Sequence, residues 1–202
     1  MAITNGYLTR AELKAALAIQ PGDTVDDALL DEIATTASRL VDEYTGQFFY
    51  PITGGTATFT PETYYTCNTL PFTSVTTLKT DEDGDGIYEI SWSATDYQAL
   101  PSNAPLFTRP YTRIEVRPTG TRAFPINLTS SVQIIGNLGW TTHPSDVGQA
   151  TTIQATTIYE ARKSPFGIAG ATETGIIRMS SRMHPEAQLL LDGYRLHNGI
   201  IG

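Results

Sequence analysis

Two abrupt changes of composition, near residues 56 and 140, constrain the fold of this chain more than any single motif. Between them Thr, Tyr, Val and Ile dominate, and Pro and Gly interrupt them at short intervals. This composition is typical of short strands joined by turns. Before and after this stretch, apolar residues recur at helical spacing. The sequence therefore predicts helices at both ends of the chain and an antiparallel sheet or small barrel between them, an α+β fold.

The N-terminal end predicts two helices. Thr9 and Glu12 have the spacing of a capping box, and Leu8 and Leu13 that of a hydrophobic staple. This first helix has to end before Pro21 and Gly22.

A longer second helix follows. We expect Thr24 to cap it and Gly46 to end it, with Asp26 and Asp27 favourable near the positive end of its dipole. Its apolar stripe is predicted to consist of Leu29, Ile33, Leu40 and Tyr44.

The remaining elements follow from turn residues and spacing. The predicted strands lie near 57–66, 74–80, 87–93, 96–100, 112–117 and 131–139. A third helix is expected from Ser145, as its cap, to about Arg162, and Pro185 is expected to start a short fourth helix. The glycine-rich segment 164–181 is predicted to be too irregular for a regular element.

Charge and composition exclude several classes of protein. The formal net charge of −8 and the pI of about 4.8 argue against a protein that grips DNA. No apolar run is long enough to span a membrane, and the N-terminus does not resemble a signal peptide. Cys67 is the single cysteine, so no disulfide can form within the chain. We therefore expect folding in a reducing cytoplasm and no contact with a membrane.

The segment DEDGDGIYEI, residues 81–90, partly matches a calcium-binding loop. Asp81, Asp83 and Asp85 occupy its first, third and fifth positions. The twelfth position should hold a bidentate carboxylate, but Trp92 stands there. Because Asp and Gly also suit tight turns, a β-hairpin turn is the preferred interpretation. These three aspartates are only a weak metal candidate, and a calcium-dependent binding module remains the alternative function.

Motifs for catalysis were not found. His143, His184 and His197 lack the spacing of metal ligands, and no nucleophile motif or phosphate-binding loop occurs. We therefore expect no enzymatic activity and no cofactor. An undetected hydrolase would need an acid–base pair or an activated nucleophile, and the sequence suggests neither.

The two chain ends resemble a known family. Segment 7–49, YLTRAELKAALAIQPGDTVDDALLDEIATTASRLVDEYTGQFF, looks like the opening of tailed-phage head–tail connector proteins, also called adaptor or head-completion proteins. The matching positions are Asp26, Asp27, Leu29, Leu30, Ala37, Ser38, Tyr44, Thr45, Gly46, Gln47 and Phe49. From residue 136 onward, the chain is similar to the family's return helix, glycine-rich loop and last helix. Together the two regions cover roughly the first quarter and the final third of the chain.

This resemblance implies both an architecture and a function. Residues 1–52 and 141–202 would form a small helical bundle, and residues 53–140 an inserted β domain. The protein would be a structural component of the virion at the head–tail interface. It would form a ring, expected to be dodecameric, beneath the portal protein, and would bind a downstream stopper or tail-terminator protein. DNA would pass through the lumen without specific binding.

Two groups of residues are candidates for these contacts. An acidic lumen would repel phosphates and let DNA slide, and the second helix carries Asp31, Glu32 and Asp42. The uncharged C-terminal tail carries Leu196, Ile200 and Ile201, which would be exposed to water in an isolated subunit. Because such adaptors often use their C-terminal region against the portal, we expect these three residues to dock there.

Overall fold

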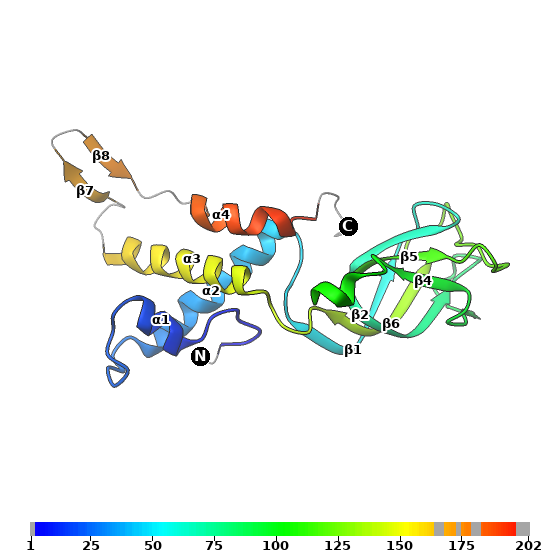
Figure 1. The fold of residues 1–202 in the computed structure, drawn as a ribbon, viewed down its shortest axis with the longest axis horizontal. Coiled ribbons are helices and arrows are strands. Elements are labelled where there is room, and N and C mark those ends of the chain that lie inside the picture. Colours follow the sequence, from blue (N-terminus) through cyan, green and yellow to red (C-terminus); the bar gives the residue numbers. More distant parts are fainter. Residues whose placement is uncertain (1–2, 164–167, 173–174, 179–182, 197–202) are drawn as a thin grey trace. The chain divides into compact units, whose positions relative to one another are not determined.

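The computed structural model describes residues 3–163, 168–172, 175–178 and 183–196 (Figure 1). The chain divides into two compact units. One contains the described residues of Met1–Gln47 and His143–His197, and the other contains Phe48–Thr142. The regular structure of the first unit is mainly helical and that of the second consists mainly of strands, so the fold class α+β is confirmed.

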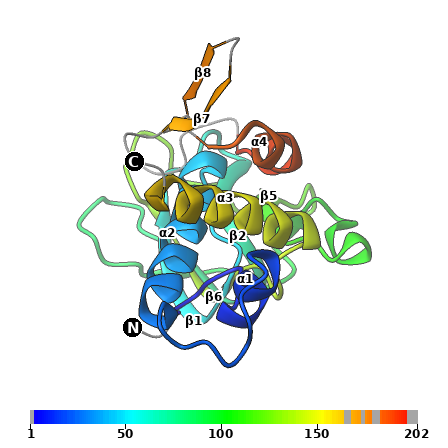
Figure 2. The same ribbon diagram turned by 90° about the vertical axis from the view of Figure 1, so that its left-hand side faces the viewer.

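The helical unit combines both ends of the chain. Its helices are α1 (Arg10–Ala16), α2 (Asp27–Thr45), α3 (Ser145–Lys163) and α4 (Pro185–Leu191). α2 lies beside α3, α1 contacts both of them, and α4 lies against α3 (Figures 1 and 2). The predicted capping box is present at Thr9 and Glu12, and Leu8 and Leu13 are buried in the same apolar core. The start of the chain thus folds as the sequence predicts.

The predicted start of α2 is wrong. Asp26, not Thr24, precedes the first residue of the helix. Thr24 instead forms a turn, in which its carbonyl oxygen accepts the Asp27 backbone N–H at 3.3 Å. The Lys14 ammonium donates to the Asp23 carbonyl oxygen at 2.6 Å and so fixes the chain just before this turn. The end of α2 is as predicted, because Gly46 adopts the left-handed conformation with φ of 69°.

The buried face of α2 also differs from the predicted stripe. Ile33 is buried, but Leu29, Leu40 and Tyr44 are only partly buried. The fully buried apolar side chains are Leu30, Ile33, Ala34, Ala37 and Val41. Small alanines on this face allow the neighbouring helices to approach closely, and a pattern of large apolar residues does not reveal that face.

α3 contains threonines, which are poor helix formers, and it accommodates them by bonding their hydroxyl groups to its own backbone. The Thr151 hydroxyl donates to the Val147 carbonyl oxygen at 2.7 Å, and Thr152, Thr156 and Thr157 make equivalent bonds. Val147 and Ala150 are buried. Ser145 is the first residue of the helix and not its cap.

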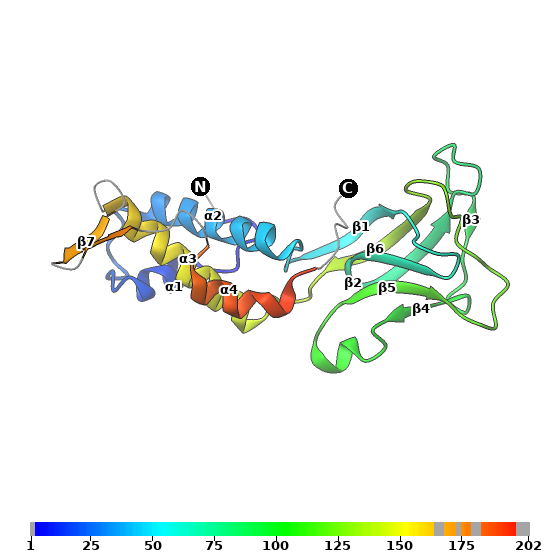
Figure 3. The same ribbon diagram turned by 90° about the horizontal axis from the view of Figure 1, so that it is seen from above.

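The β unit is an open six-stranded sheet in which every paired strand is antiparallel (Figure 3). Its strands are β1 (Pro51–Phe59), β2 (Thr66–Thr80), β3 (Ile90–Ser91), β4 (Tyr97–Leu100), β5 (Tyr111–Val116) and β6 (Val132–Gly139). The order is β1-β6-β2-β5-β4, and β3 pairs with β2. Of the two predicted arrangements, an antiparallel sheet and a small barrel, the structure shows the antiparallel sheet. The predicted strand 57–66 was misplaced, because residues 60–65 connect β1 to β2.

The sheet buries its own apolar core. Its largest fully buried side chains include Phe72, Phe124, Leu78 and Ile114. Trp92 stacks on Phe124 with ring centroids 4.7 Å apart and an interplanar angle of 15°. Between β4 and β5 lies a short 3-10 helix, η1 (Ala104–Phe107). This unit therefore has the independent core expected of a domain.

The segment between α3 and α4 is not irregular throughout, contrary to the prediction. Two strands, β7 (Ile168–Thr172) and β8 (Gly175–Arg178), pair antiparallel in a sheet of their own. Three glycines interrupt this segment and conceal the Ile and Thr residues that favour strands.

The described end of the chain lies in the helical unit. Pro185 occupies the first turn of α4, as predicted, and the imidazole of His184 accepts the Glu186 backbone N–H. A 3-10 turn, η3 (Asp192–Tyr194), follows. The Leu196 backbone N–H then donates to the Thr45 carbonyl oxygen at 2.9 Å, at the end of α2.

Candidate functional site

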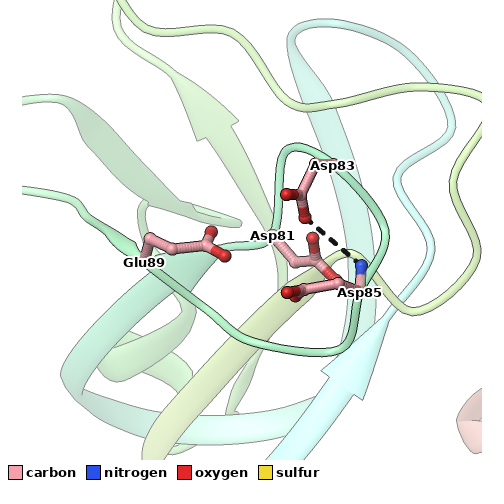
Figure 4. A group of neighbouring side chains, drawn as sticks. All are labelled: Asp81, Asp83, Asp85 and Glu89. Carbon is pink, nitrogen blue, oxygen red and sulfur yellow. Dashed lines mark hydrogen bonds between the residues drawn. The ribbon is translucent and has the colours of Figure 1, made fainter.

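Four carboxylates gather in the loop between β2 and β3 (Figure 4). They belong to Asp81, Asp83, Asp85 and Glu89, and one ligand oxygen of each lies within 4.8 Å of the others. Lys79 and Thr80 pair with Ser91 and Ile90, so the segment closes a hairpin. The structure therefore brings the weak metal candidates together and adds Glu89 to them.

Asp81 already has a structural role in this loop. Its two carboxylate oxygens accept the backbone N–H groups of Gly84 and Gly86 at 2.7 and 2.8 Å, and the residue is 4% exposed. Burial opposes ionisation, but these hydrogen bonds outweigh it and lower the pKa of Asp81. Both glycines have a positive φ, of 82° and 86°, which residues with a side chain rarely adopt. The Asp–Gly pattern is thus explained by the turn itself.

The twelfth position of the calcium template has no oxygen to offer. Trp92 is buried, and its indole N–H donates to the Thr80 hydroxyl at 3.0 Å. Asp83 and Asp85 also accept backbone N–H groups within the loop, from Asp85 and Ile87. The carboxylates could still hold a cation weakly, but the loop is stabilised by its own hydrogen bonds.

The carboxylates predicted on α2 have different environments. Asp31 is 3% exposed and pairs with Arg10, whose Nε lies 2.7 Å from Oδ1 and whose Nη2 bonds Oδ2. The hydrogen bond from Arg10 lowers the pKa of Asp31, although burial acts in the opposite direction. Asp27 extends the cluster by pairing with Arg10 at 2.7 Å and with Lys14 at 2.5 Å. Asp31 therefore holds α1 against α2 within the subunit.

Sequence reasoning missed this cluster, although a signal for it exists. Arg10 and Lys14 are four residues apart, and so are Asp27 and Asp31. Two such pairs place two cations on one face of α1 and two carboxylates on one face of α2, in matching spacing. Only the packing of the two helices shows that these charges meet.

Asp42 is also engaged within the subunit. Its carboxylate accepts the Tyr7 hydroxyl group and pairs with Arg39 at 3.3 Å. Burial raises the pKa of Asp42. Glu32 is exposed, and so is Glu43, eleven residues further on the same side of the helix. Glu32 and Glu43 are therefore the two exposed carboxylates of α2, and another molecule can contact them.

The C-terminal candidates are only partly described. Leu196 is half-buried near Gly46, while Ile200 and Ile201 lie outside the described residues. Leu189 on α4 is 77% exposed, a feature that the sequence did not single out. No helix in the described ranges is long and apolar enough to cross a membrane.

The described residues show no assembled catalytic group. His143 lies against the Tyr7 ring with centroids 5.6 Å apart, and His184 caps α4, so these two histidines do not share a site. His197 lies outside the described residues. Cys67 is completely buried, which raises the pKa of its thiol to about 12. Within the described ranges, the acidic loop is the one cluster with the donor set for a metal ion.

Comparison with known proteins identifies the fold. No family model matches the chain, and no curated protein matches its sequence. Its structure matches a chain in the neck of an empty gene transfer agent (GTA) particle computed with C6 symmetry, with a TM-score of 0.58 and 20% identity. The chain has the fold of a GTA neck component. The match covers 100% of this chain and 96% of the neck chain.

A second structure gives the same result. A chain in the virion of the native GTA particle matches with a TM-score of 0.54 and 20% identity, again over 100% of this chain and 96% of the other. The resemblance seen at the two chain ends is confirmed at the level of the fold, and the match extends through the β unit.

Calcium should leave the stability of the protein unchanged. A ligand at a hundredfold excess over its dissociation constant would stabilise the folded state by about 2.7 kcal/mol. We expect equal melting temperatures with calcium and with a chelator, because the loop supplies its own hydrogen bonds. A rise of several degrees with micromolar calcium, absent from an Asp83→Asn/Asp85→Asn variant, would contradict the turn interpretation and favour a calcium-binding module.

Replacing Asp31 should destabilise the helical unit. Asp31→Asn removes a charged partner of Arg10 and should lower the free energy of unfolding at pH 7 by about 1–3 kcal/mol. The pKa of Asp31 is lowered in the folded state, so its contribution is present above about pH 4 and is lost as the pH falls further. The difference between wild type and variant should therefore shrink toward pH 3.

The control for this prediction is the neighbouring exposed carboxylate. Glu32→Gln should change the free energy of unfolding by less than about 0.5 kcal/mol at any of these pH values. Chemical denaturation followed by circular dichroism measures both variants. Equal stability of Asp31→Asn and wild type at pH 7 would show that the Arg10 contact does not stabilise α1 against α2.

Proposed function

We propose that this chain is a structural virion protein, a head–tail adaptor that forms a ring beneath the portal and lets DNA pass through its lumen. The observation that supports it best is the match to the GTA neck chain, which spans the whole of this chain and both of its units. The order of motifs at the two chain ends supports the same role. We propose a downstream stopper or tail-terminator protein as the second partner.

The charge of the chain suits a ring around DNA. Each copy contributes a formal charge of −8, so a closed ring, which we propose to be dodecameric, would be strongly acidic. An acidic lumen repels phosphate groups and prevents DNA from adhering to the wall. Asp31 and Asp42 are engaged within the subunit, and we therefore assign the lumen-facing role on α2 to Glu32 and Glu43.

Charge reversal on α2 should slow DNA ejection. Glu32→Lys/Glu43→Lys changes only exposed side chains, so the fold should persist while the lumen gains phosphate-binding cations. We expect particles that assemble normally but eject DNA at least several-fold more slowly, measured by dye entry after receptor triggering. The matched control, Glu82→Lys/Asp83→Lys in the β2–β3 loop, should eject at the wild-type rate. Normal ejection by the α2 variant would show that this face of α2 lies outside the lumen.

We propose that the C-terminal end docks on the portal. Leu196 is fixed to the end of α2 by its backbone, so residues 197–202 continue from a defined point of the helical unit. These residues include Ile200 and Ile201 and no charged side chain. Burying each isoleucine on the portal would stabilise the complex by roughly 1.5–3 kcal/mol, and the gain repeats around a ring.

Without its C-terminal residues 197–202, the protein should no longer support attachment of the phage tail. Deletion of residues 197–202 should leave a folded subunit with an unchanged circular dichroism spectrum. Portal binding by a single subunit should fall at least about a hundredfold, which is the loss of roughly 3 kcal/mol. DNA-filled heads without tails should then accumulate.

Point variants distinguish the contribution of the apolar side chains from that of the length of the C-terminal segment. Ile200→Ser/Ile201→Ser should reproduce the binding defect of the deletion, and His197→Ser/Asn198→Ser should bind like wild type. Full tail attachment by the truncated protein would exclude the docking role.

A further inference from the structure

The helical unit has an apolar groove along one side of α1. Its apolar lining includes Ile3, Ala11, Ala15, Ala18 and Ile19, and its volume is about 740 Å³. The three alanines are exposed, so short side chains leave the groove open to solvent. No side chain of this subunit fills the groove among the described residues.

The charged side chains at the rim of this groove differ in their exposure to solvent. The Arg10 side chain is 41% exposed, whereas its partners Asp27 and Asp31 are 22% and 3% exposed. A molecule approaching the groove therefore meets a guanidinium group beside an apolar surface. An acidic segment that carries an exposed apolar side chain would complement both features.

This chain contains such a segment in the loop between α1 and α2, which projects from the helical unit (Figure 1). Val25 in this loop is 89% exposed, the highest value among the large apolar side chains that the structure describes as exposed. Residues 17–26, which join α1 to α2, include Asp23 and Asp26 and no Lys or Arg. Val25 does not line the groove of its own subunit.

Hydrogen bonds hold the loop in one conformation, which lowers the conformational entropy that docking would cost. The Lys14 ammonium donates to the Asp23 carbonyl oxygen at 2.6 Å. The Asp23 carboxylate accepts the Val25 N–H at 3.1 Å, and the Asp23 N–H donates to the Gln20 carbonyl oxygen at 3.0 Å. These bonds fix the backbone that leads to Val25, whose side chain is exposed to solvent.

We propose that Val25 of one copy inserts into the α1 groove of an adjacent copy, with Asp23 close to the neighbour's Arg10. Val25, which we call the knob, does not line the groove of its own copy, so the contact is head-to-tail and can repeat from copy to copy until a ring closes. This inference rests on the proposed ring and names the surface that joins its subunits. The occupant of the groove is therefore a second copy of this chain.

Cysteine cross-linking tests the contact directly. Val25→Cys/Ala15→Cys places one thiol on the knob and one in the groove, and both positions are exposed. Under mild oxidation the double variant should give a ladder of covalent dimers, trimers and larger species on a non-reducing gel. Each single variant should stay monomeric, because one thiol then faces an unmodified partner. Wild type should also stay monomeric, because Cys67 is buried.

A matched control pairs the knob with a thiol outside the groove. Val25→Cys/Leu189→Cys carries two exposed thiols and should give no ladder, which excludes random collision. A covalent dimer from Val25→Cys alone would mean that two loops meet symmetrically and would overturn the proposal. Absence of a ladder from the knob–groove pair would overturn it as well.

Portal binding by the reduced double variant separates this inference from the proposed function. Binding without a ladder on oxidation would reject the Val25 contact and leave the adaptor role standing. A ladder without portal binding would support the contact between copies and count against the adaptor role.

Discussion

The pairing of Arg10 with Asp31 fixes α1 against α2, and much of the helical unit depends on where these two helices lie. A carboxylate that is 3% exposed is costly unless a cation and hydrogen bonds compensate for its lost hydration. Arg10 supplies both, while Lys14 joins Asp27 to the loop that precedes α2. These charged residues also line the groove beside α1, and Lys14 anchors the loop that carries the exposed Val25. One ionic cluster thus connects the stability of the subunit to the surface proposed for assembly.

α2 in turn holds the two ends of the chain together. The Tyr159 hydroxyl of α3 donates to the Asp26 carboxylate at 2.9 Å near the start of α2. The Leu196 N–H bonds the Thr45 carbonyl oxygen at its other end. Hydrogen bonds between segments that precede and follow the β unit in the sequence therefore join the two parts of the helical unit. Because the sheet has its own core, its surface can change without altering the contacts of the helical unit.

Local signals in the sequence were sufficient for much of the fold. The capping box at Thr9, the left-handed Gly46 and the first-turn Pro185 each act through neighbouring backbone, so they could be predicted from a few residues. The strands were found for the same reason, since Thr, Val, Ile and turn residues alternate within short windows. Strand boundaries were predicted wrongly where strand-favouring residues continue into a connecting loop, as in the predicted strand 57–66.

Features that depend on packing between distant segments could not be predicted. Ala34 and Ala37 face the core of the helical unit because the neighbouring helices come close, and a search for large apolar residues overlooks them. Asp31 was expected to be exposed, but Arg10 from another helix buries it. The glycines between α3 and α4 concealed a pair of short strands. The acidic loop was correctly predicted as a turn, because Asp81 and its two glycines are close in sequence.

We propose that copies of this chain assemble into a ring on the portal, and electron microscopy of the purified chain mixed with its cognate portal would show that ring. We expect a closed ring of this chain coaxial with the portal, with an open channel wide enough for duplex DNA. Isolated monomers beside unoccupied portals, at concentrations well above those found in the infected cell, would contradict it.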